Sequence, residues 1–165
     1  MTDQQIETLS RELDAAFRNR ADLYRLFLEE LEASVGLDAA EALMVRVIEK
    51  RGREVAAAAF SGFGPNDARA IGEAFLAASP DGGRMYPTEV DRGADRITFR
   101  VKRCPLKDAW VEAGVGDDRL TVLCRIAGAF DRGLFAATGV RFENVTWSPG
   151  HGPGCCHICL TDRDA

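Results

Sequence analysis

The sequence predicts an α+β fold, in which N-terminal helices precede a ββααββ unit whose antiparallel sheet packs on helices. In the first 80 residues, apolar side chains recur at the three- and four-residue spacing of amphipathic helices. The composition then shifts at Ser79–Gly83, and Ile97, Phe99 and Val101 alternate with polar residues as in a strand. A length of 165 residues predicts a single domain, 1–165, with a helical part at 1–80 and an α+β part at 85–161.

The helical part is expected to begin with a helical hairpin, because the polar segment Arg18–Arg20 interrupts its apolar pattern. Asp38 and Glu41 have the spacing of a capping box at the start of a long second helix. The glycine- and proline-rich segment 62–65 ends that helix, and Asn66 or Asp67 caps the next one.

The sheet is expected to start with a strand over Met85–Val90, joined by a polar loop to the alternating strand that ends at Val101. Pro87 cannot donate a ladder hydrogen bond, so this first strand is predicted to lie at an edge. The element order is also compatible with an α/β plait.

The remaining elements are two helices and two strands. Pro105 suits the first turn of a short helix, and a second helix is predicted from Asp117 to Thr138, closed by Gly139. Strand patterns follow over 140–147, with a possible bulge, and over 155–161, separated by a glycine-rich loop.

Composition narrows the function classes. A net charge of −5 lacks the positive field that binds phosphates, so no nucleic-acid partner is expected. The N-terminus has no export signal and no apolar run is long enough to span a bilayer, which predicts a cytoplasmic protein without a membrane partner. Dinucleotide, P-loop and serine-hydrolase motifs are absent. A small-molecule partner is expected, and the N-terminal helices either cover the sheet or form a homodimer face.

The cysteines gather in the C-terminal part of the chain. An odd number of thiols without an export signal indicates free thiols or metal ligands, although small buried cysteines can also serve only as core residues. The five positions are Cys104, Cys124, Cys155, Cys156 and Cys159.

Two of these positions favour chemistry. Cys104 precedes a helix start, where backbone N–H groups and the helix dipole favour a thiolate. Cys124, Gly128 and Asp131 share one helix face, so a thiol and a carboxylate could lie over an open glycine. The neighbouring apolar stripe is also compatible with plain core packing.

The last strand offers two alternative sets of side chains. Alternation from residue 155 places Cys156 toward the helices, where it can meet Cys104 and Cys124, and places Cys155, His157 and Cys159 on the other face. Zinc accepts three thiolates with a histidine or a water, so Cys104, Cys124, Cys156 and His157 form a candidate metal set. His151 in the glycine loop is either a general base or a solvated residue.

These residues together resemble a known family. Over residues 85–161 the sequence is similar to the L-2-amino-thiazoline-4-carboxylic acid hydrolase family. The residues that carry this similarity are Arg103-Cys104-Pro105-Leu106, the helix from Leu123-Cys124 to Gly133, Trp147 and Gly154-Cys155-Cys156. More distantly, the ending resembles vinyl-reductase-type ligand-binding domains and the fold of TRAPP subunits. Here Ala127 stands where the family pattern has an acid, and His157 and Ile158 replace an acid and an aromatic residue.

The resemblance implies hydrolytic opening of a cyclic amidine-like acid to a carbamoyl cysteine. Cys104, Cys124, Cys156 and Asp131 are then the catalytic candidates, acting through a thiolate or a metal-activated water. Arg100 or Arg132 would hold the substrate carboxylate, and Trp147 is a further substrate-binding candidate.

Two other functions remain open from the sequence. The chain could be a non-catalytic binding domain of the vinyl-reductase type that senses or carries a small hydrophobic molecule, a tetrapyrrole or a metal ion. It could also be a subunit whose cysteines only pack. Turnover, bound ligand or metal, and the effect of replacing Cys104, Cys124 and Cys156 discriminate among these functions.

Overall fold

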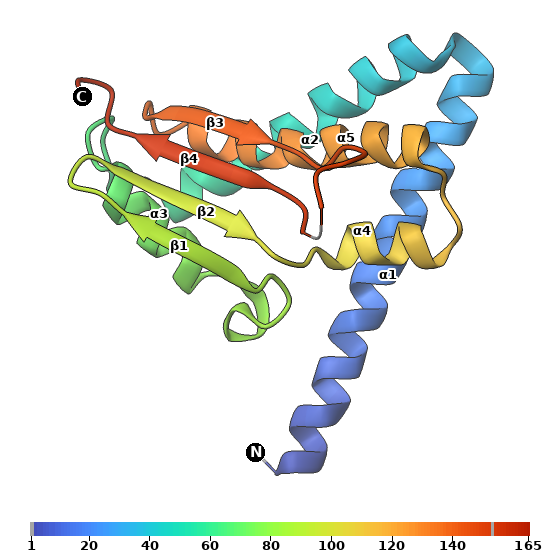
Figure 1. Ribbon diagram of the computed structural model, residues 1–165, viewed down its shortest axis with the longest axis horizontal. Helices are drawn as coiled ribbons and strands as arrows, with labels where there is room; N and C mark the ends of the chain where they lie inside the picture. The colour runs from blue at the N-terminus through green and yellow to red at the C-terminus, as the bar shows by residue number, and fades with distance from the viewer. Residues whose placement is uncertain (1, 153) are drawn as a thin grey trace.

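A computed structural model describes residues 2–152 and 154–165 and confirms the α+β prediction (Figure 1). Within these residues, helices precede, separate and cover the strands of an antiparallel sheet. The helices are α1 (Asp3–Val35), α2 (Leu37–Ala59), α3 (Ala68–Ala77), α4 (Pro105–Glu112) and α5 (Asp117–Ala136), with a short 3₁₀ turn at Pro80–Gly83. The strands are β1 (Thr88–Arg92), β2 (Arg96–Val101), β3 (Arg141–Val145) and β4 (His157–Thr161).

The sheet has the strand order β1-β2-β4-β3, and each neighbouring pair is antiparallel. Alternation gives it one apolar face, where Phe99 of β2 lies opposite Ile158 of β4 and both are buried. The other face carries exposed residues such as Arg100 and His157. β1 is an edge strand that begins just after Pro87, three residues later than the predicted start, because Met85 is buried in the preceding turn.

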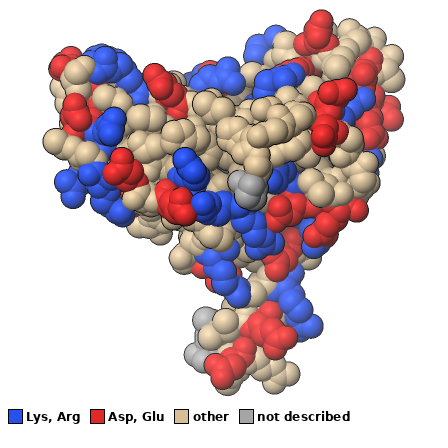
Figure 2. Space-filling view, in the orientation of Figure 1, with Lys and Arg blue, Asp and Glu red and all other residues tan. Residues whose placement is uncertain are grey.

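The helices cover the apolar face of the sheet in layers (Figure 1). α3 and α5 contact the strands, α2 packs along α5, and α4 packs against α1. The indole Nε1–H of Trp110 on α4 donates a 2.8 Å hydrogen bond to the carbonyl oxygen of Ala21 on α1, which attaches these two helices. Lys, Arg, Asp and Glu side chains are interspersed over the face shown in Figure 2. None of the helices in the described ranges is both long and apolar enough to cross a membrane.

The predicted N-terminal hairpin is wrong, because α1 is one continuous helix through Arg18–Arg20. These three residues are exposed, so the polar segment is only part of the solvent-facing side of the helix. The real turn comes at Gly36, whose φ of 82° is readily adopted only by glycine. α2 starts directly after it without a side-chain cap, so the capping box predicted from Asp38 and Glu41 does not form.

Other boundaries lie close to the predicted ones. Asp67 precedes α3, Cys104 precedes α4, and Gly139 with a φ of 83° follows the end of α5, which stops at Ala136 rather than Thr138. The third strand is shorter than the predicted 140–147 segment. The last strand begins at His157 rather than Cys155, and this difference changes where the cysteines point.

α2 and α5 approach each other at two glycines. A Cβ atom on Gly133 would overlap the carbonyl oxygen of Glu49, and one on Gly52 would overlap the backbone of Phe130. We expect Gly133→Ala to lower the free energy of unfolding by about 3 kcal/mol, because backbone atoms cannot make room for a methyl group without separating the helices. Urea denaturation measures this loss, and Gly116→Ala, which meets open space, is the control. Equal stability of the two variants would contradict the close contact.

Candidate functional site

A cavity of about 340 Å³ lies between the apolar face of the sheet and the helices. Its walls come from all five helices and from the strands β1, β2 and β4, together with the segment that leads into β4. One end contains thiols and a few polar groups, and the remaining wall is mainly aliphatic and aromatic. The residues with reactive or polar side chains that define the first end are Arg20, Tyr86, Cys104, Cys124, Asp131, Cys155 and Cys156.

Four cysteines meet at this end of the cavity. Cys104, Cys124 and Cys155 are buried in one core cluster, and the half-buried Cys156 packs against it. The Sγ atoms of Cys155 and Cys156 are 3.1 Å apart, and all four thiols are free. The sequence therefore predicted correctly that Cys104, Cys124 and Cys156 come together, although they lie on separate elements.

Cys104 is the thiol best prepared to be a nucleophile. A hydrogen bond from Cys155 lowers the pKa of Cys104, and the backbone N–H groups of Lys107 and Leu106 at the start of α4 act in the same direction. These interactions outweigh burial, which raises the pKa of a thiol. The thiolate form of Cys104 is therefore favoured over that of an ordinary cysteine.

The neighbouring thiols have the opposite tendency. Hydrogen bonds to Cys104, Cys124 and Cys156, together with burial, raise the pKa of Cys155, so this residue keeps its proton. For Cys156, the hydrogen bond from Cys155 lowers the pKa, but burial and the nearby Asp131 outweigh it and the net shift is upward. Cys104 is thus a favoured thiolate beside two thiols, Cys155 and Cys156, that keep their protons.

Cys155 is a site residue that the sequence analysis assigned to the wrong face. Strand alternation does not apply to it, because β4 starts two residues later. Gly154 has a φ of 114° and approaches Val101 closely, and the amide of Cys155 then donates a 3.0 Å hydrogen bond to the carbonyl oxygen of Val101. A glycine directly before a cysteine pair was the signal for a bend at this point.

We expect Cys155→Ala to raise the pKa of Cys104, because the variant loses the donor that stabilises the thiolate. The rate at which iodoacetamide alkylates Cys104 should then rise toward its plateau at higher pH than in the wild type, as mass spectrometry of the labelled peptide can measure. Cys159→Ala is the matched control, since Cys159 bonds Thr98 and Thr161 instead. An unchanged midpoint in the first variant would contradict the role of Cys155.

Asp131 faces the same cavity from α5. Desolvation raises its pKa to about 7, although the positive charge of Arg20 acts against this rise. Because the pKa lies near neutrality, the carboxyl group can both donate and accept a proton at physiological pH. Burial and the nearby Cys104 thiolate also raise the pKa of Tyr86, so its phenol keeps its proton.

Arg20 stands at the edge of the cavity on α1. Its guanidinium donates a 3.1 Å hydrogen bond to the hydroxyl of Tyr24 and lies 6.0 Å from the centre of the Phe130 ring. Among the residues that the structure describes, it forms no ion pair with a carboxylate within 4.0 Å. Neither Arg20 nor Tyr86 is predictable from the sequence, because a lone arginine on an amphipathic helix and a lone tyrosine before a strand carry no recognisable signal.

Several predicted site residues do not line the cavity. Arg100 is exposed on the outer face of β2, and Arg132 is exposed on α5 next to Asp131. Trp147 packs against the cysteine cluster from outside, with the Nζ of Lys107 5.9 Å from its ring centre. His151 is exposed in its loop.

The donor set for a metal is incomplete. His157 is exposed and paired with Val145 and Arg100, so it lies on the opposite face of the sheet from the thiols. Across residues 2–152 and 154–165, no three His, Cys, Asp or Glu side chains are grouped as a metal ion requires.

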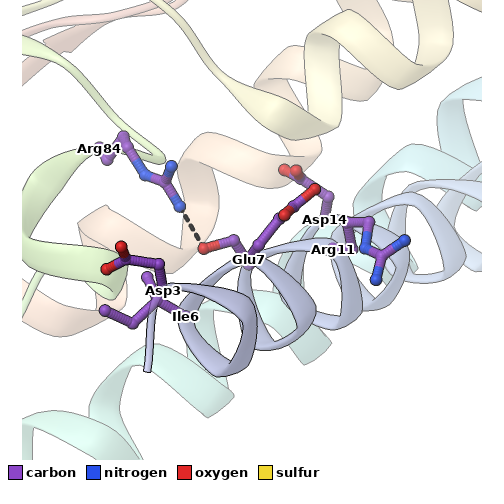
Figure 3. Close-up of a pocket in the computed structure, with 7 residues that line it drawn as sticks. Asp3, Ile6, Glu7, Arg11, Asp14 and Arg84 are labelled. Atoms are coloured by element: carbon purple, nitrogen blue, oxygen red, sulfur yellow. Dashed lines mark hydrogen bonds between the residues drawn. The ribbon is translucent and has the colours of Figure 1, made fainter. Parts of the chain in front are cut away.

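A second pocket of about 280 Å³ lies between the N-terminal half of α1 and Arg84 (Figure 3). Arg84 donates hydrogen bonds to Ser10 and to Asp81, and charged side chains of both signs surround it. The pocket is open to solvent, and no cysteine is among its lining residues. Its lining residues are Asp3, Ile6, Glu7, Ser10, Arg11, Asp14 and Arg84.

Comparison with known proteins gives the family. The sequence model described as L-2-amino-thiazoline-4-carboxylic acid hydrolase matches residues 16–160, which include every residue that lines the thiol-containing cavity. The chain belongs to this family. The match extends well beyond the resemblance at 85–161, because it includes most of the N-terminal helices. A search of curated proteins found no match.

A solved structure supports the fold assignment. The crystal structure of a trafficking protein particle complex subunit 3 from Naegleria fowleri, covalently bound to palmitic acid, matches with a TM-score of 0.55 and 14% identity. The match covers 89% of this chain and 95% of that chain. The predicted TRAPP-like arrangement is thus confirmed for a member of the hydrolase family.

Proposed function

We propose that this chain is a hydrolase that opens a small cyclic carboxylate such as L-2-amino-thiazoline-4-carboxylate by attack of the Cys104 thiolate. The observation that carries the proposal is that a favoured thiolate and a carboxyl group with a pKa of about 7 face the same cavity. Membership of the family supports hydrolysis in general.

In the first half of the proposed reaction, the Sγ of Cys104 attacks the ring carbon between sulfur and nitrogen. The electron pair of the C=N bond moves to the ring nitrogen, which takes the proton of Asp131. The bond between this carbon and the ring sulfur then breaks, and the sulfur leaves as a thiolate. Cys104 now carries the opened substrate through a new S–C bond.

In the second half, water attacks the same carbon while the ionised Asp131 accepts a proton from it. The S–C bond to Cys104 breaks, its thiolate returns, and the remaining proton goes to the sulfur released from the ring. One water is consumed and a carbamoyl cysteine is formed. A carboxyl group with a pKa near 7 suits this exchange, because donation and acceptance cost similar free energy at neutral pH.

Arg20 is the proposed partner of the substrate carboxylate. It lies at the edge of the cavity near Asp131, whereas Arg100 and Arg132 point elsewhere. A guanidinium can hold a carboxylate through two parallel hydrogen bonds, which would orient the ring toward Cys104. Tyr86, a protonated phenol in the same wall, is a second donor.

The test is a turnover assay with L-2-amino-thiazoline-4-carboxylate. Ring opening releases a thiol that a chromogenic disulfide detects in samples from which the protein has been removed. We expect turnover by the wild type, no turnover after alkylation of Cys104, and full turnover after treatment with a chelator. Loss of activity on chelation with recovery on adding zinc would overturn the thiolate mechanism. Protection of Cys104 from alkylation without turnover would instead favour the non-catalytic binding domain.

A further inference from the structure

The cavity continues beyond its reactive end. Cys124, Gly128, Asp131 and Leu134 line it from one face of α5. At 1.5 Å per residue, ten residues of helix between Cys124 and Leu134 correspond to about 15 Å along the wall. Asp131 lies seven residues, or about 10 Å, along α5 from Cys124, and the wall continues past it to Leu134, so a five-membered ring held beside Cys104 and Asp131 would leave this last part empty.

The far part is apolar. It is lined by Val55 and Ala59 of α2, Phe60, Phe75 of α3 and Leu134 of α5. Phe60 and Leu134 belong to a hydrophobic cluster distinct from that of the thiols, and Cys156 packs against both clusters. The cavity therefore connects a reactive polar end in one cluster with an apolar end in the other.

The size of the cavity agrees with this division. A volume of about 340 Å³ falls within the range of roughly 300–1,000 Å³ that is typical of sites for drug-sized ligands. Water gains few hydrogen bonds in an apolar space, so an apolar group of the ligand is its most favourable occupant.

We infer that the substrate of this site is amphipathic, with a cyclic carboxylate head at Cys104 and Asp131 and an alkyl or aryl substituent in the apolar end at Phe60 and Phe75. The inference rests on the proposed function for the identity of the head, and it adds the substrate class. Alkyl and aryl groups are both apolar, so either can fill the apolar end. An aryl ring can also pack edge to face against Phe60 and Phe75.

A substrate series tests the inference. The parent 2-amino-thiazoline-4-carboxylate is compared with derivatives that carry methyl, propyl, hexyl or benzyl groups. In each derivative the group is attached to the ring carbon that lies between the sulfur and the carbon bearing the carboxylate. Each buried methylene should increase kcat/KM about fourfold until the cavity is filled. The hexyl and benzyl derivatives should therefore exceed the parent by at least tenfold, and their relative rates show whether a chain or a ring fits better.

Ala59→Phe supplies the matched variant, because Ala59 lies at the end of α2 beside the apolar end and is itself exposed on one side. It should abolish the gain from the hexyl group, so that the hexyl derivative is turned over no faster than the parent compound. Ala58→Phe, at an exposed neighbouring position outside the cavity, should retain the gain.

Protection of Cys104 from iodoacetamide is measured for the same series, so that the two proposals can fail separately. Turnover of the parent without any gain from the substituents would overturn the amphipathic substrate and leave the hydrolase. If protection of Cys104 increases with the size of the substituent but no compound is turned over, the ligand is amphipathic and hydrolysis is overturned. Neither turnover nor protection would overturn both.

Discussion

Replacement of Cys104 by serine is expected to reduce kcat for ring opening by at least about 10³-fold. A serine hydroxyl is almost fully protonated at neutral pH, and the hydrogen bond from Cys155 that favours a thiolate cannot ionise it to a useful extent. Steady-state kinetics measure the loss. Binding of the parent compound should change little, because the bond from Cys104 to the substrate forms in the transition state and not in the bound ground state.

Cys159→Ser is the control for this experiment. Cys159 lies on β4 with its Sγ near the hydroxyls of Thr98 and Thr161, outside the cavity, and its replacement should leave the rate unchanged. A Cys104→Ser variant that retains more than a tenth of the wild-type rate would contradict nucleophilic attack by this thiol.

Asp131→Asn is expected to lower kcat by about 10²- to 10⁴-fold, the usual contribution of general acid–base catalysis. In the wild type, the proton donor is lost as pH rises through about 7, so the rate should fall above this pH. The residual rate of D131N should show no such fall, because an amide does not titrate there. A pH–rate profile from pH 5 to 9 measures both effects, and an unchanged alkaline limb in the variant would contradict the assignment.

The same substitution should stabilise the folded protein at alkaline pH. Burial raises the pKa of Asp131 from its ordinary value of 3.8 to about 7, so between these values the folded state binds more protons than the unfolded state. Stability from this group is therefore greatest at low pH and is lost as pH rises toward 7. At pH 8, the free energy of unfolding of D131N should exceed that of the wild type by up to about 4 kcal/mol, as urea denaturation can measure. Equal stability at pH 8 would place the carboxyl group in water.

Much of the fold was predictable because local patterns determine it. The alternation at Ile97, Phe99 and Val101 gave a correct strand, and the Cys104-Pro105 pair gave a correct helix start. The hairpin at Arg18–Arg20 failed because exposed polar residues continue a helix as readily as they end one. Gly36, the residue at the actual turn, is a single glycine without any accompanying break in composition.

The site was predictable only where its residues share an element or a motif. Spacing on one helix face placed Cys124 and Asp131 together, and both line the cavity. Arg20 on α1 and Tyr86 just before β1 come from distant segments, and only the tertiary packing brings them to the cavity that the thiols line. Cys155 depended on a two-residue shift in where β4 begins, which is smaller than the precision of sequence-based boundaries.

The glycine contact between α2 and α5 has a consequence for ligand size. Gly52 lies one turn before Val55 on α2, and Gly133 adjoins Leu134 on α5, so the two helices that wall the apolar end touch there through their backbones. Larger residues at either glycine would spread the helices and widen the cavity without altering a lining side chain. The distance between the two helix backbones, and not only the size of the lining side chains, thereby limits the size of the ligand that the cavity can hold.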